Sequence, residues 1–101
     1  MNKRLIDYQE RLIKELQDPE EAIAYLNAAL VDDDPRMFLL ALKNVIEAHS
    51  GISDLAKATN LNRENLYRML SPKGNPKLTS IVPVLSSLGL HLAVQANDHK
   101  K

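Results

Sequence analysis

The chain of 101 residues contains no cysteine and no tryptophan, and it has only three glycines and one phenylalanine. The lack of cysteine excludes disulfides and metal sites with thiolate ligands. With so few glycines, no glycine-rich phosphate-binding loop is present. No apolar run approaches the ~20 residues that a membrane span needs, and no signal-peptide core follows residues 1–4. We therefore expect a cytoplasmic protein without a membrane segment.

Residue types that act in catalysis or metal binding form no recognisable set. His49, His91 and His99 are scattered, and no pair of them has metal-ligand spacing. The run of three aspartates at residues 32–34 lacks the alternating ligands and distal glutamate of a calcium loop, and it is better explained as a helix cap and loop. We expect no enzyme, no metal and no cofactor.

Acidic and basic residues are equal in number but unevenly distributed. Residues 7–34 carry a net charge of −7, whereas residues 50–80 carry a net charge of +3. This distribution indicates one half suited to a polyanion and another half suited to a basic partner. The charge distribution alone is equally consistent with two surfaces that bind no partner and are only solvated differently.

Apolar spacing and capping residues predict six helices, over residues 5–16, 19–31, 35–49, 52–59, 63–70 and a last one ending at residue 88. Asp18, Asp34 and Asn62 are the expected N-caps. Pro83 either bends the last helix or delays its start. The expected buried faces are Leu5, Tyr8, Leu12 and Leu16; Ala22, Ile23, Leu26, Ala29 and Leu30; Phe38, Ala41, Leu42, Val45, Ile46 and His49; and Leu78, Ile81, Val82, Leu85 and Leu88.

The periodicity changes after Gly89. Leu90, Leu92, Val94 and Ala96 alternate with other residues, as in a half-buried strand. A lone strand leaves its backbone N–H and C=O groups without hydrogen-bond partners. The simplest partner is the same strand of a second subunit. We therefore predict dimerisation through Leu90, Leu92 and Val94, with a disordered or packed extended tail as the alternative.

Residues 51–70 fit two short helices that cross over a tight turn, a helix-turn-helix. Ala56 allows the helices to approach closely, and Asn60 suits a left-handed turn position. The residues spaced to fill the core between the helices are Leu55, Leu61, Leu66 and Met69.

The second of these helices leaves an exposed face that could enter a DNA major groove. The candidate base-contacting residues are Arg63, Glu64, Asn65, Tyr67 and Arg68. Arginine can form two parallel hydrogen bonds with guanine, and asparagine can do so with adenine. The candidate phosphate-contacting residues are Ser53, Lys57, Asn62, Lys73, Asn75 and Lys77. Each of these side chains alone is typical of a solvated surface, and only the surrounding helix-turn-helix favours DNA.

Residues 22–30, Asp34-Pro35, residues 61–70 and Gly74-Asn75-Pro76 together resemble the addiction-module antidote proteins. These are HigA-like antitoxins of the Xre (lambda-repressor-like) helix-turn-helix class, and the resemblance spans residues 8–92. It implies a homodimer that binds a palindromic operator in double-stranded DNA and neutralises a RelE/ParE-like toxin. Asn60 replaces the commoner glycine of the family, and Pro83 interrupts its last helix.

We therefore predict an all-α, lambda-repressor-like helix-turn-helix bundle. Its expected parts are an acidic N-terminal helical segment (residues 1–34), a DNA-binding domain (residues 35–89) and a C-terminal dimerisation strand and tail (residues 90–101). A stand-alone prophage-type repressor without a toxin is the first alternative. A protein-interaction module that no longer binds DNA is the second.

Overall fold

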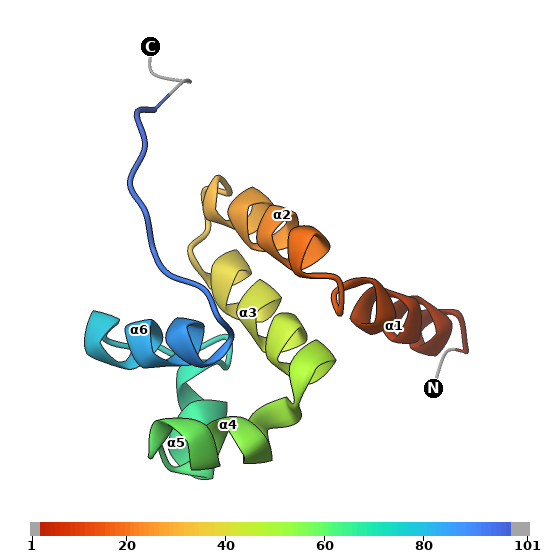
Figure 1. The fold of residues 1–101 in the computed structure, drawn as a ribbon. Helices are drawn as coiled ribbons and strands as arrows, with labels where there is room; N and C mark the ends of the chain where they lie inside the picture. Colours follow the sequence, from red (N-terminus) through yellow and green to blue (C-terminus); the bar gives the residue numbers. More distant parts are fainter. Residues whose placement is uncertain (1–2, 98–101) are drawn as a thin grey trace.

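The computed structural model describes residues 3–97, which form six helices and no strand (Figure 1). The helices are α1 (Lys3–Glu15), α2 (Pro19–Leu30), α3 (Arg36–His49), α4 (Gly51–Thr59), α5 (Arg63–Met69) and α6 (Leu78–Ser87). The predicted all-helical class is confirmed, and each predicted helix boundary lies within two residues of the observed one.

Two helices organise the packing. α3 packs against α1, α2 and α4, and α4 packs in turn against α5 and α6. Figure 1 shows α2 and the start of α3 at one end of the molecule and the α4–α5 pair at the other. Leu42 and Val45 of α3, Leu66 of α5 and Val84 of α6 are fully buried in one continuous core. The core therefore fixes the α4–α5 pair relative to the rest of the chain.

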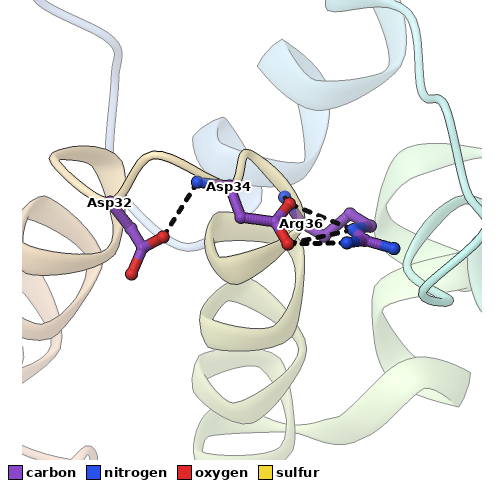
Figure 2. Close-up of polar contacts among 3 residues, drawn as sticks. All are labelled: Asp32, Asp34 and Arg36. Atoms are coloured by element: carbon purple, nitrogen blue, oxygen red, sulfur yellow. Dashed lines mark hydrogen bonds and ion pairs between the residues drawn. The ribbon is translucent and has the colours of Figure 1, made fainter.

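Aspartates precede both α2 and α3. Asp18 is the N-cap of α2 as predicted: its Oδ1 accepts a hydrogen bond from the backbone N–H of Glu20 at 3.0 Å, and Pro19 occupies the first helical position. The predicted N-cap Asp34 is wrong, because α3 begins one residue later and its N-cap is Pro35, which makes no side-chain cap hydrogen bond. Asp34 Oδ1 accepts from the backbone N–H of Arg36 at 3.0 Å, and Asp32 Oδ1 accepts from the backbone N–H of Asp34 at 2.8 Å (Figure 2). The aspartate run thus forms the turn before α3.

Asp34 also forms an ion pair with Arg36. The guanidinium Nη2 lies 2.7 Å from Asp34 Oδ2, and Nε also donates to this carboxylate (Figure 2). These hydrogen bonds and the positive charge lower the pKa of the Asp34 carboxyl below 3.8. Both side chains are largely exposed, so the pair contributes little to stability.

A polar group joins the first three helices. Asn44 of α3 is the one buried polar residue in the described range. Its Nδ2 donates to the hydroxyl of Tyr25 in α2 at 2.8 Å, and its Oδ1 accepts from Nε2 of Gln9 in α1 at 3.1 Å. The buried amide is therefore satisfied, and it fixes α1 and α2 against α3.

The predicted apolar faces of α1 and α3 are partly wrong. Leu5 and Tyr8 are 65% and 62% exposed, and α1 has no buried residue at all. Leu16, just beyond α1, is buried as predicted. His49 was expected on the apolar face of α3 but is exposed at its end. Apolar periodicity identifies the side chains that share a face of a helix. In α1 the other helices leave most of that face uncovered.

The predicted face of α6 is also wrong in part. Val82 and Leu78 are exposed, whereas Val84 is fully buried with Ile81 and Leu85. α6 begins at Leu78 and continues through Pro83, so the proline does not delay the start of the helix. The core contacts of α6 therefore follow a stripe of residues 81, 84 and 85.

The chain reverses direction at Gly89. Gly89 has a φ of +79°, and the N–H of Leu90 donates to the carbonyl oxygen of Leu85 at 2.8 Å, so α6 ends as predicted. Residues 90–97 then run beside the α2–α3 pair without regular secondary structure (Figure 1). A strand is defined by hydrogen bonds to a neighbouring strand, and this single chain supplies none, so the predicted strand is not confirmed. Residues 98–101 of the predicted tail lie outside the described residues.

Candidate nucleic-acid interface

Ser50 separates α3 from α4, and α4 begins with a glycine. The N–H of Ser50 donates to the carbonyl oxygen of Ile46 at the end of α3, and Gly51 follows with a φ of +82°. This backbone conformation favours glycine and turns the chain into α4. Ile52 and Leu55 of α4 are then buried against the core. The inner face of α4 is thereby fixed, and its other face is left to solvent.

The turn at residues 60–62 is held by local hydrogen bonds. Thr59 Oγ1 donates to the carbonyl oxygen of Leu55 at 2.8 Å and accepts from the N–H of Leu61 at 3.3 Å. Asn60 adopts the left-handed conformation with a φ of +62°, as the sequence predicted. Asn62 Oδ1 accepts from the backbone N–H groups of residues 64 and 65, so its predicted role as the N-cap of α5 is confirmed.

α5 has one buried side and one exposed side. Leu66 is fully buried, and Met69 and Leu61 pack against the core from partly buried positions. The five side chains predicted to contact bases are all exposed: Arg63, Glu64, Asn65, Tyr67 and Arg68. The structure thus presents these candidate residues on a short helix whose other side is anchored in the core.

The predicted phosphate-contacting residues lie on either side of α5. Ser53 and Lys57 are exposed on α4, Asn62 is exposed at the start of α5, and Lys73, Asn75 and Lys77 are exposed in the loop before α6. Among the described residues, no ion pair joins a lysine or arginine of residues 50–80 to an acidic side chain. The end of the molecule that carries α4 and α5 therefore keeps the net positive charge of residues 50–80.

The loop after α5 approaches the helix very closely at Gly74. The N–H of Gly74 donates to the carbonyl oxygen of Ser71 at 2.8 Å, and Ser71 Oγ donates to that of Arg68 at 2.7 Å. A Cβ on Gly74 would overlap the carbonyl oxygen of Met69. Only glycine therefore fits at this position without a shift of the backbone. The sequence motif did not reveal this steric requirement.

The residues predicted to form the dimer lie away from α5. Leu90 is half-buried, Leu92 is 43% exposed and Val94 is 99% exposed. They lie in the segment that leaves α6 and runs towards the end of α2 (Figure 1). The structure therefore separates these residues from the candidate DNA-contacting ones.

Sequence reasoning missed one surface feature. Ile23 and Leu30 of α2 were expected in the core but are 43% and 52% exposed, and they line a groove with residues 90–93. The acidic bias of residues 7–34 indicates a surface for a basic partner, but apolar spacing alone gives no sign that Ile23 and Leu30 stay uncovered.

Among residues 3–97, no group of three or more histidine, aspartate or glutamate side chains could hold a metal ion. None of the helices in this range is long and apolar enough to cross a membrane.

Comparison with known proteins identifies the family. Residues 8–96 match the family model described as "Probable addiction module antidote protein". The chain belongs to this family. An uncharacterized protein of Haemophilus influenzae (strain ATCC 51907 / DSM 11121 / KW20 / Rd) is 33% identical over 95 residues, which cover 94% of this chain and 95% of that protein. No solved structure gives a significant match to the chain. The antidote family of the sequence analysis is confirmed, while its HigA-like, Xre-type assignment stays a prediction.

Proposed function

We propose that this antidote-family protein is the antitoxin of a toxin–antitoxin module and that it binds its own operator as a homodimer. The observation that carries the proposal is the α4–α5 pair, in which a capped helix with an anchored inner side presents Arg63 and its neighbours to solvent. Family membership supports a cognate toxin as the second partner. The protein then acts in the cytoplasm as a regulator and not as an enzyme.

In this proposal α4 and α5 form a helix-turn-helix, and α5 enters the major groove. Residues near the N-terminus of a recognition helix usually reach the bases, which favours Arg63 and Glu64. Arg68 lies further along α5 and reaches a base or a phosphate. Whether Asn65 and Tyr67 contact bases depends on the tilt of α5 in the major groove. The six flanking polar residues hold the DNA backbone and set the register.

An Arg63→Ala variant tests direct base reading. If Arg63 pairs with guanine, specific affinity falls by about 1–3 kcal/mol, and discrimination is lost at one base position. Electrophoretic mobility shifts on the upstream DNA and on single-base variants measure both effects. Arg11→Ala on α1 is the matched control and should bind like the wild type. Equal weakening on every DNA sequence would instead make Arg63 a phosphate contact.

The homodimer is proposed to form through antiparallel pairing of residues 90–94. The exposed Leu92 and Val94 and the unpaired backbone around them support it. Truncation after Gly89 should give a monomer by light scattering that binds a half-site weakly. An unchanged molar mass would exclude this interface. In the dimer, the two α5 helices should lie about 34–36 Å apart, or a multiple of that spacing.

The toxin is proposed to be a small, basic, RelE/ParE-like ribonuclease encoded beside this chain. Co-expression of the two proteins and co-purification test this directly. A chain that binds the operator but never retains the neighbouring product would be a stand-alone repressor. A chain that retains that product but binds no upstream DNA would be a protein-interaction module.

A further inference from the structure

A groove of about 980 Å³ lies between α2 and the segment that follows α6. Ile23, Leu26 and Leu30 of α2 line one side, and Leu90 and Leu92 line the other. Figure 1 shows α2, which lines the groove, at the end of the molecule opposite to α4 and α5. A partner bound in the groove therefore leaves the candidate DNA-contacting residues free.

The groove exposes more apolar surface than a solvated face needs. Ile23 is 43% exposed, Leu30 is 52% exposed and Leu92 is 43% exposed, and all three line it. Contiguous exposed apolar surface rimmed by polar residues marks interaction sites on soluble proteins. We therefore expect apolar side chains of a partner to pack into this groove.

Asp32 and Asp33 form an acidic border at the end of α2. Asp33 lines the groove and Asp32 precedes it, whereas Asp34 is paired with Arg36. Residues 15–35 contain seven acidic residues and no lysine or arginine, but of these acidic residues Asp33 is the one that lines the groove. Apolar side chains beside carboxylates are complementary to a segment that is apolar on one face and basic on the other.

We propose that this groove binds a basic amphipathic helix of the cognate toxin, so the inference rests on the antitoxin function proposed above. Apolar side chains of the helix pack on Ile23, Leu30 and Leu92, and its lysines and arginines lie against the aspartates after α2. Insertion of an amphipathic helix into an apolar groove is a recurring mode of recognition. The homodimer proposed above joins two copies through the backbone edge of residues 90–94. A second copy seated in the groove itself fits poorly, because a two-fold contact there would bring the same acidic border of both copies together.

The test is a calorimetric titration of the wild-type chain and two matched variants with the purified toxin encoded beside it. Leu30→Lys places a positive charge in the groove at a position that is already 52% exposed. Leu40→Lys makes the same change at a position on α3 that is 50% exposed and does not line the groove. Circular dichroism verifies that both variants are folded. We expect Leu30→Lys to raise the Kd at least about tenfold and Leu40→Lys to change it by less than about twofold.

A charge-reversal pair tests the acidic border. Asp33→Lys should also weaken the complex, whereas Asp7→Lys on α1 should not, and added salt should weaken the wild-type complex. If the wild-type chain binds the toxin and Leu30→Lys and Asp33→Lys bind it equally well, the groove is not the toxin site, and the antitoxin function stands. A wild-type chain that binds no toxin overturns both proposals. If Leu30→Lys converts a dimer of the chain alone into a monomer, the groove joins two copies, and the inference is wrong.

Discussion

Replacing Gly74 by alanine tests whether the loop after α5 is as tightly packed as the structure shows. The new Cβ would overlap the carbonyl oxygen of Met69 and lie 2.6 Å from its carbonyl carbon and 2.7 Å from the carbonyl oxygen of Arg68. All three are backbone atoms, so no side-chain rotation relieves the overlap. The loop or the end of α5 must move.

Two opposing effects set the size of the change. Alanine restricts the unfolded chain more than glycine does, which stabilises the fold by about 0.4–1 kcal/mol. Overpacking typically costs about 1–3 kcal/mol, and an overlap with backbone belongs at the upper part of this range. We therefore expect Gly74→Ala to lower the free energy of unfolding by about 1–2 kcal/mol. For a chain of this size the corresponding fall in Tm is about 4–16 °C.

Thermal unfolding followed by circular dichroism measures this change. Asn75→Ala is the control, because Asn75 is exposed and its substitution should shift Tm by no more than about 4 °C. Operator affinity of Gly74→Ala should also fall, since Arg68 lies on the turn of helix that must move. A Gly74→Ala protein that melts with or above Asn75→Ala would refute the reasoning, because the loop would then move freely.

Three further predictions concern single residues. Asn60→Ala should lower the free energy of unfolding by about 1–2 kcal/mol, because Asn60 has a φ of +62° and alanine tolerates this conformation poorly. Asn60→Gly should not be destabilising, and urea titrations measure both variants. Asn44→Ala removes two hydrogen bonds that join α1, α2 and α3 and should cost about 1–3 kcal/mol, while Tyr25→Phe, which removes one of them, should cost less. The pKa of the Asp34 carboxyl, followed by NMR, should lie below 3.8 and return towards this value in Arg36→Ala. Because the folded state lowers this pKa, the small stabilisation is present above pH 3.8 and is lost as the pH falls through the lowered pKa.

The helix boundaries could be predicted because they depend on local chemistry. Asp18 and Asn62 cap the helices that follow them through side-chain hydrogen bonds to nearby backbone N–H groups. Asn60 and Gly89 adopt the left-handed conformations that their residue types permit. Each of these interactions lies within a few residues of the chain, so the sequence contains all that is needed to find it.

The buried faces were predicted less well because they depend on distant residues. Leu30 and Val82 lie on apolar helices, but no other element covers them, whereas Val84 is covered completely. The requirement for glycine at residue 74 likewise arises from the approach of two backbone segments. For the candidate DNA interface, the exposure of α5 followed from its apolar spacing, while its position relative to the groove beside α2 required the packed structure.

The weak attachment of α1 has a consequence for hydrogen exchange. α1 has no buried residue, and it is held to α3 by the Gln9–Asn44 hydrogen bond and by the half-buried Leu12 and Ile13. Elements with few buried apolar contacts open at a lower free energy than the core. Amides of α1 should therefore exchange with deuterium well before those of α3, and among the helices proteases should cleave α1 before α3. A partner that covers the exposed side of α1 would reveal itself by slowing this exchange.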